Sequence, residues 1–189
     1  MQVQALEIPE VKLITPRRFA DSRGYFCETY NAKTFAAAGI ATEFVQDNES
    51  HSAKKGTVRG LHFQAPPFAQ TKLVRVLKGA ILDVAVDGRK SSNSYGAWIT
   101  AKLSAESGAQ LLVPAGFLHG FVTLEADTIV AYKVDAHYDR ASEGAVRWND
   151  PDLGVDWGMA PEAATVSAKD AAAPAFRDWT SPFVWEERP

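Results

Sequence analysis

The stretch KLVRVLKGAILDVAV, residues 72–86, decides the fold class of this chain. Valine, isoleucine and leucine alternate there with other residue types, which is typical of a strand with one buried face. Gly79 interrupts the pattern, and a glycine inside a strand pattern indicates a turn or a bulge. We therefore expect β-structure over the whole stretch, broken only at Gly79.

The segments that follow carry the same signal. DGRKSSNSYG, residues 87–96, is a loop of turn-forming residues. Further strands are expected at residues 97–103, 110–113, 121–124 and 127–134, with a Pro-Gly turn at 114–116. Short strands separated by turns at this spacing predict an antiparallel sandwich or barrel.

Helix signals are few. Residues 31–39 (NAKTFAAAG) predict one short helix that ends at Gly39. The alanine-rich residues 168–176 predict a second helix, broken by Pro174. The fold is therefore expected to be mainly β.

Composition bounds the class of protein. The chain has 189 residues, of which 46% are hydrophobic and 23% charged, and its formal net charge is -3. This is ordinary for a globular domain and shows no bias toward nucleic acid or anionic membranes. Cys27 is the only cysteine, so no intrachain disulfide can form. No signal peptide is visible, nor any apolar run of the ~20 residues that span a membrane. We expect a cytoplasmic protein with one domain over residues 1–189, which has a strand-like N-terminal segment (3–13) and a C-terminal arm.

Two segments share a pattern that begins with glycine and reaches a histidine. Residues 56–64 read GTVRGLHFQ, and residues 108–119 read GAQLLVPAGFLH. The pair resembles the two motifs of the cupin superfamily. The resemblance implies a cupin-type antiparallel double-stranded β-helix, or jelly-roll barrel, with a few short helices and an active site at its mouth.

The first motif departs from a metal-binding cupin. Such a cupin needs a His-x-His pair and a glutamate there, but Gln64 replaces the second histidine and no glutamate lies between Gln64 and Gly79. Zinc, iron and manganese sites need several converging histidine or carboxylate ligands. Only His62 and His119 remain as donors, so we expect no catalytic metal.

Positive charges accompany the first motif. Lys72 and Arg75 lie on an expected strand beside His62, and Arg23 lies in a polar turn. Such side chains usually face solvent. Arg59 differs because it lies in an apolar, glycine-flanked turn, TVRGLHF, where a charge needs a specific partner. Phosphate oxygens, which arginine binds in a bidentate manner, would supply that partner.

More of the chain resembles one family. The sequence is similar to dTDP-4-dehydrorhamnose 3,5-epimerases at FADSRGYF (19–26), QDNES (46–50), RGLHFQ (59–64), QTKLV (70–74), PAGFLHGF (114–121), AYKV (131–134) and WNDPDLGVDW (148–157). The similarity covers nearly the whole chain. It implies epimerisation of dTDP-4-dehydro-6-deoxy-D-glucose at C3 and C5, giving dTDP-4-dehydro-L-rhamnose for dTDP-L-rhamnose biosynthesis. It also implies a homodimer that shares strands, with residues near Arg23 reaching the partner's pocket.

The resemblance assigns roles to individual residues. His62 would be the base, Asp170 the carboxylate that orients it, Tyr132 the acid on the opposite face of the sugar, and Lys72 the residue that touches the C4 oxygen. The substrate-binding positions would be Arg23, Phe26, Glu28, Gln46, Asp47, Asn48, Arg59, Lys72, His119, Tyr138, Glu143 and Lys169, with Tyr138 stacked on the thymine.

These residue types suit the reaction. A ketone at C4 acidifies the hydrogens on C3 and C5, so inversion needs a base, an acid and a group that stabilises the enolate. A neutral histidine titrates near the working pH, and a carboxylate on its second nitrogen fixes its tautomer. A lysine ammonium meets the charge that develops on the C4 oxygen. No glycine-rich dinucleotide fingerprint is present, so we expect no cofactor.

Other interpretations remain open at this stage. His62 could be a core histidine, Tyr132 a packing residue with its hydroxyl at the rim, and His119 a turn cap. The protein could be an epimerase for C3 alone or a ketoisomerase acting on the same nucleotide sugar. It could also be a non-catalytic cupin that binds a sugar, or a metal-dependent cupin oxygenase, which Gln64 disfavours.

Overall fold

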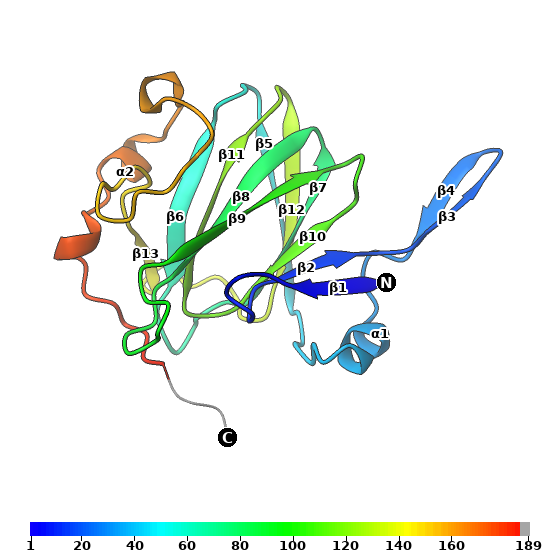
Figure 1. Ribbon diagram of the computed structural model, residues 1–189, viewed down its shortest axis with the longest axis horizontal. Helices are drawn as coiled ribbons and strands as arrows, with labels where there is room; N and C mark the ends of the chain where they lie inside the picture. Colours follow the sequence, from blue (N-terminus) through cyan, green and yellow to red (C-terminus); the bar gives the residue numbers. More distant parts are fainter. Residues whose placement is uncertain (186–189) are drawn as a thin grey trace.

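Two antiparallel sheets pack face to face and form a barrel (Figure 1). The computed structural model describes residues 1–185. The six-stranded sheet has the order β1 (Gln2–Ala5), β2 (Lys12–Thr15), β10 (Gln110–Val113), β7 (Lys72–Lys78), β12 (Thr128–Val134) and β5 (Gln46–Ser52). The five-stranded sheet has the order β13 (Glu143–Ala145), β6 (Val58–Gln64), β11 (Phe117–Thr123), β8 (Ala80–Asp87) and β9 (Trp98–Ser104). A separate hairpin pairs β3 (Arg18–Asp21) with β4 (Gly24–Cys27).

The expected jelly-roll barrel is confirmed, and so is the turn within residues 72–86. Gly79 separates β7 from β8 and has a φ of 79°, a conformation that glycine adopts without strain. The strand expected at residues 121–124 is longer than predicted, because β11 begins directly after the turn at Gly116 and therefore includes His119.

Apolar side chains fill three layers. The interior between the sheets holds the inward residues of β7, β8, β10, β11 and β12. The outer face of the five-stranded sheet is covered by the segment from Val146 to Phe183, which contributes three tryptophans. The outer face of the six-stranded sheet packs against helix α1 (Ala32–Ala37), whose Phe35 is buried. Helix and C-terminal segment thus lie on opposite sides of the barrel (Figure 1).

The helices are short. Asn31 caps α1, because its side chain accepts hydrogen bonds from the amides of Lys33 and Thr34, and Gly39 follows the helix with a φ of 79°. Helix α2 spans only Ala168–Ala171, shorter than expected, since the residue before Pro174 is driven away from helical geometry. Two 3-10 turns, η1 (Pro161–Ala163) and η2 (Phe176–Asp178), flank it.

A bulge in β6 decides which side chains face the interior. His119 of β11 lies opposite His62, while Phe121 lies opposite Arg59, so three residues of β6 match two of β11. Normal alternation would send Arg59 and His62 to opposite faces, and the extra residue brings both to the interior. Arg59 is therefore in a strand at the bulge, and not in the turn that the sequence suggested.

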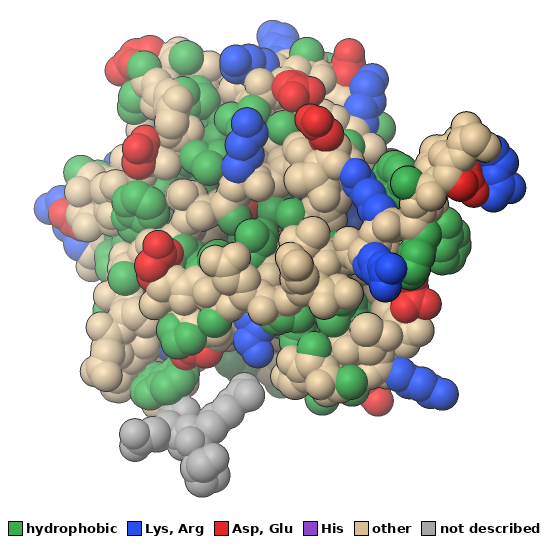
Figure 2. Space-filling model, turned by 45° about the vertical axis from the view of Figure 1, so that its right-hand side comes forward, with side chains coloured by type: hydrophobic (Ala, Val, Ile, Leu, Met, Phe, Trp, Pro, Cys, Tyr) green, Lys and Arg blue, Asp and Glu red, His purple; other side chains and the backbone are tan. Residues whose placement is uncertain are grey.

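The β3–β4 hairpin projects from the barrel (Figures 1 and 2). Its aromatic residues are unusually exposed, with Phe19 at 51%, Tyr25 at 58% and Phe26 at 68%. These aromatic side chains are therefore not packed in the core of the barrel. No helix among residues 1–185 is long and apolar enough to cross a membrane.

We expect Gly60→Ala to destabilise the fold by roughly 3 kcal/mol or more. Gly60 has a φ of 145°, and a Cβ there would lie 2.6 Å from the Cα of Gly120. Urea unfolding of the purified variants would measure the change. Gly39→Ala is the matched control, because Gly39 shares a positive φ but has no atom within 4 Å of a built Cβ; its cost should be only about 1–2 kcal/mol. Equal losses of unfolding free energy in the two variants would show that the close approach of Gly60 to Gly120 contributes nothing.

Candidate active site

One cavity of about 490 Å³ opens between the two sheets and gathers most of the predicted residues. It is lined by Ser50, Thr57, Val58, Arg59, His62, Lys72, His119, Phe121, Tyr132, Glu143, Thr165, Val166, Ser167, Lys169 and Asp170. A smaller hollow of about 150 Å³ shares His62, Lys72, Tyr132 and Glu143 with it. Gln46, Asn48 and Tyr138 line this second part, so the two hollows form one continuous site.

His62 and Asp170 form a hydrogen-bonded pair in this cavity. The distance from His62 Nε2 to Asp170 Oδ1 is 2.6 Å, and the side chain of His62 is 32% exposed whereas that of Asp170 is 5% exposed. The amide of Gly60 donates to Asp170 Oδ2 at 3.4 Å, and the Asp170 amide donates to Ser167 Oγ at 3.1 Å. Burial acts to raise the pKa of Asp170, but the hydrogen bonds and charge of its partners outweigh burial and lower it. An ionised carboxylate thus holds a histidine whose other nitrogen is available.

A second pair lies behind the first. His119 Nε2 is 2.7 Å from Asp83 Oδ1, and both side chains are buried. Burial lowers the pKa of His119, which keeps the ring neutral near pH 7. Asp83 was not among the residues predicted from the sequence. The signal was present, because Asp83 interrupts the apolar run of β8, where a buried acid needs a partner.

Lys72 and Tyr132 reach the cavity from neighbouring strands. Burial lowers the pKa of Lys72 to about 8, against the opposing attraction of Asp83 and Glu143. Burial also raises the pKa of Tyr132, so its hydroxyl keeps its proton at neutral pH. The cavity therefore offers the ammonium of Lys72 and one protonated phenol, that of Tyr132.

Charged and aromatic groups surround the mouth. The ammonium of Lys169 is 2.6 Å from Glu143 Oε2, and the Tyr138 hydroxyl donates to the same oxygen at 3.2 Å. Lys169 lowers the pKa of Glu143. The Tyr138 amide donates to Gln46 Oε1 at 3.0 Å, and Gln46 Nε2 donates to Asn48 Oδ1 at 2.8 Å. Tyr138 is 56% exposed, which leaves its ring free to stack.

Arg59 is partly held by the protein itself. Its Nε donates to Ser52 Oγ at 3.2 Å, and one Nη donates to the His51 carbonyl at 2.9 Å. Arg75 follows Lys72 by three positions in β7, which places it on the outer face of the sheet, away from the cavity.

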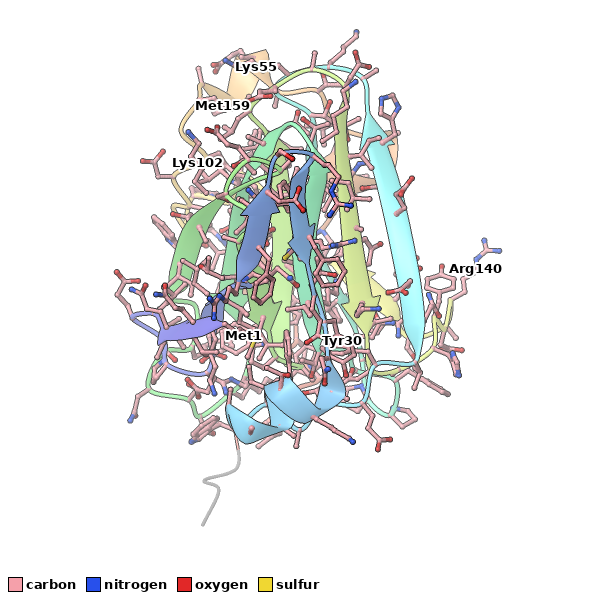
Figure 3. The ribbon with its side chains drawn as sticks, turned by 90° about the vertical axis from the view of Figure 1, so that its right-hand side faces the viewer. Met1, Tyr30, Lys55, Lys102, Arg140 and Met159 are labelled. Carbon is pink, nitrogen blue, oxygen red and sulfur yellow. The ribbon has the colours of Figure 1, made fainter. Side chains whose placement is uncertain are left out.

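Four predicted binding residues lie outside this cavity. Arg23, Phe26 and Glu28 lie on or just after the projecting hairpin, where Arg23 pairs with Asp21 at 2.6 Å. Asp47 alternates with Gln46 and Asn48 along β5 and so faces outward. It accepts from the Lys133 ammonium at 2.9 Å on the outer face of the sheet. Tyr30 lies on that face as well, its ring centroid 5.3 Å from the Lys133 ammonium (Figure 3).

The side chain of Gln64 forms hydrogen bonds with backbone groups of neighbouring loops. Its amide nitrogen donates to the carbonyls of Phe68 and His137 at 2.7 and 3.2 Å, and its oxygen accepts from the Asp139 amide at 2.9 Å. Within residues 1–185 no three His, Cys, Asp or Glu side chains are grouped so that they could hold a metal ion.

A larger hollow of about 990 Å³ lies at the barrel rim, and it lacks comparable chemistry. No histidine or tyrosine is among its lining residues. Its one arginine, Arg89, is already bound by Asp87 at 2.8 Å and by Glu10 at 3.0 Å. We therefore take the cavity between the sheets as the candidate active site.

Comparison with known proteins gives consistent matches. The family model for dTDP-4-dehydrorhamnose 3,5-epimerase matches residues 5–178. The dTDP-4-dehydrorhamnose 3,5-epimerase of Sinorhizobium fredii is 53% identical over 178 residues, which are 93% of this chain and 90% of that protein. The crystal structure of the Bacillus anthracis enzyme with TDP and PPi bound has a TM-score of 0.89 and 47% identity, covering 93% of this chain and 99% of that one. The Legionella pneumophila dTDP-6-deoxy-D-glucose-3,5-epimerase in complex with dTDP-4-keto-L-rhamnose has a TM-score of 0.92 and 39% identity, covering 98% of both chains.

We expect Lys72 to titrate well below the other lysines. Its pKa of about 8 means that the ammonium is charged below pH 8 and neutral above it. Nitrogen NMR of labelled lysine side chains would follow the titration, with Lys72→Met identifying the resonance. Lys102→Met, which removes an exposed lysine of β9, is the matched control and should leave the shifted resonance in place. A single common pKa above 10 for all lysines would contradict a desolvated ammonium.

Proposed function

This chain belongs to the dTDP-4-dehydrorhamnose 3,5-epimerase family, and from that membership and its cavity we propose how it acts. It converts dTDP-4-dehydro-6-deoxy-D-glucose to dTDP-4-dehydro-L-rhamnose by inverting C3 and C5, a step of dTDP-L-rhamnose biosynthesis. The observation that carries this function is the His62–Asp170 pair, which shares one cavity with the protonated hydroxyl of Tyr132.

His62 is the proposed base. With Asp170 accepting from Nε2, the neutral ring presents the lone pair of Nδ1 and can take a proton from C5 or C3. The Asp170 carboxylate then stabilises the imidazolium that forms, as in other His–Asp pairs. Tyr132 returns a proton to the opposite face of the same carbon, which inverts the centre.

Lys72 is the proposed partner of the C4 oxygen. Removal of a proton beside the ketone places negative charge on that oxygen. The Lys72 ammonium lies in the same cavity, partly removed from water, where a fixed positive charge stabilises an anion more strongly than it would in bulk solvent. The enolate then needs no other positive group at that oxygen.

The polar mouth is the proposed nucleotide site. The exposed ring of Tyr138 suits stacking on thymine, and Arg59 and Lys169 suit the diphosphate. Gln46, Asn48, His119 and Glu143 are the other proposed contacts of this chain with the nucleotide sugar as a whole. The bound TDP and dTDP-4-keto-L-rhamnose in the two solved relatives support a thymidine nucleotide as the carrier.

We also propose a homodimer in which each hairpin completes the partner's site. The exposed Phe19, Tyr25 and Phe26 need an apolar cover, and Arg23 and Glu28 would reach the partner's nucleotide. A groove of about 330 Å³ on the outer face of the six-stranded sheet, in which Tyr30, Leu73 and Leu77 lie among polar and charged residues, is the proposed contact surface. Strand β1 is an unpaired sheet edge that could add to the contact.

Isotope exchange tests the reaction. In deuterated water without added metal ion or nicotinamide, we expect NMR of the product to show deuterium at both C3 and C5. His62→Ala should lose exchange and epimerisation together, whereas Tyr132→Phe should retain exchange while inversion falls. A positioned acid or base contributes roughly 10²–10⁴-fold, so each loss is easily measured.

Controls separate chemistry from folding. His51→Ala removes an exposed histidine outside the cavity and should leave the rate unchanged. Circular dichroism must show native structure for each variant. Deuterium at C3 alone would favour the single-centre epimerase, and wild-type exchange in His62→Ala would reassign the base, with His119 next in line.

Light scattering tests the dimer. We expect twice the chain mass of 20.6 kDa at micromolar concentration. Phe26→Asp should weaken the dimer, whereas Phe68→Asp, which changes another exposed aromatic residue outside the hairpin, should not. A 20.6 kDa particle for the unmodified chain would count decisively against the proposal.

A further inference from the structure

The His119–Asp83 pair is not used by the proton transfers described above. Asp83 is fully buried, and its Oδ1 binds His119 Nε2 at 2.7 Å. Its other oxygen, Oδ2, is buried and has no hydrogen-bond partner among residues 1–185. A buried carboxylate is costly to keep, so its retention behind an active-site histidine calls for a function.

Asp83 determines where His119 carries its proton. Asp83 Oδ1 lies 2.7 Å from His119 Nε2, and a carboxylate oxygen in this position accepts the Nε2–H of the neutral ring. His119 lines the cavity, and its Nδ1 has no hydrogen-bond partner within the described part of the chain. Asp83 therefore leaves His119 with a lone pair, an acceptor, for whatever occupies the site.

The charged groups around His119 favour this neutral form. Burial lowers the pKa of its ring most strongly, and the positive charge of Lys72 lowers it further. Asp83 acts to raise the pKa of His119, but the pKa remains below its usual value. The ring next to the cavity is thus an acceptor, while Lys72 beside it is a donor.

An acceptor cannot bind the C4 oxygen, which is a ketone oxygen in the substrate and carries negative charge in the enolate. It needs a hydroxyl. The hydroxyl on C3 changes direction when that carbon is inverted, whereas the hydroxyl on C2 keeps its place through both inversions. We propose that Asp83 is a positioning residue that locks His119 as the acceptor for the C2 hydroxyl of the sugar, so that the pair sets specificity for a 2-hydroxylated substrate.

This inference rests on the proposed function for its substrate, but the lock itself can be measured without turnover. Nitrogen NMR of labelled histidine should show His119 protonated on Nε2 alone in the wild type. Asp83→Leu, which removes the acceptor, should give a mixture of tautomers. Asp83→Asn should keep the Nε2–H form, because the amide oxygen can accept and the amide nitrogen replaces the unpaired Oδ2.

Specificity should follow the tautomer. The wild type should favour the natural substrate over its 2-deoxy analogue by roughly tenfold in kcat/KM, the value of one good hydrogen bond. Asp83→Asn should keep that preference, and Asp83→Leu should reduce it to about onefold to threefold. Asp127→Asn, which changes the carboxylate of the exposed His51–Asp127 pair, is the matched control and should behave as the wild type does.

A failure of the proposed function can be distinguished from a failure of the inference about Asp83. No turnover of the natural substrate by the wild type would refute the proposed function while the NMR spectrum still reported the lock. A wild-type His119 that is charged or protonated on Nδ1 would overturn the inference. So would a 2-hydroxyl preference that persists in Asp83→Leu after the tautomer has changed.

Discussion

The close contact between the backbones of Gly60 and Gly120 is the constraint on which the site depends. An added Cβ at Gly60 would lie 2.6 Å from the Gly120 Cα, so only glycine allows β6 and β11 to approach this closely. The contact lies at the bulge that turns both Arg59 and His62 inward. The Gly60 amide also binds Asp170. One backbone feature therefore turns the proposed base and the proposed phosphate ligand toward the cavity and helps to hold the carboxylate of Asp170.

The two histidines of the cavity have different electrostatic surroundings. Asp170 and Asp83 each bind one histidine through Nε2, and the two histidines lie opposite each other on adjacent strands. Their exposures differ, because His62 is partly open to the cavity while His119 is almost fully buried. The first is suited to exchange protons and the second to stay neutral. Lys72 and Tyr132 supply the complementary donors.

Much of the fold followed from local pattern. Alternation predicted β7 and β8, and turn residues predicted their junction, because both depend on neighbours in the chain. The bulge was not predicted, since Gly60 and Gly120 meet only in the folded sheet, and Arg59 was consequently assigned to a turn. The site was found through its histidine motifs and family resemblance. The family resemblance placed Asp47 in the site with Gln46 and Asn48, whereas strand alternation turns its side chain to the outer face of the sheet.

The origin of Asp170 has a consequence for how the enzyme becomes competent during synthesis. Asp170 follows His62 by 108 residues and lies on α2, beyond the last strand of the barrel. All but the short β13 of the barrel strands have been made once Val134 emerges, yet His62 does not have Asp170 as its partner at that stage. The C-terminal segment must then dock on the outer face of the five-stranded sheet to deliver it. A nascent chain thus makes the barrel strands that hold His62 first, and the proposed catalytic pair forms only after the segment that follows the barrel has docked.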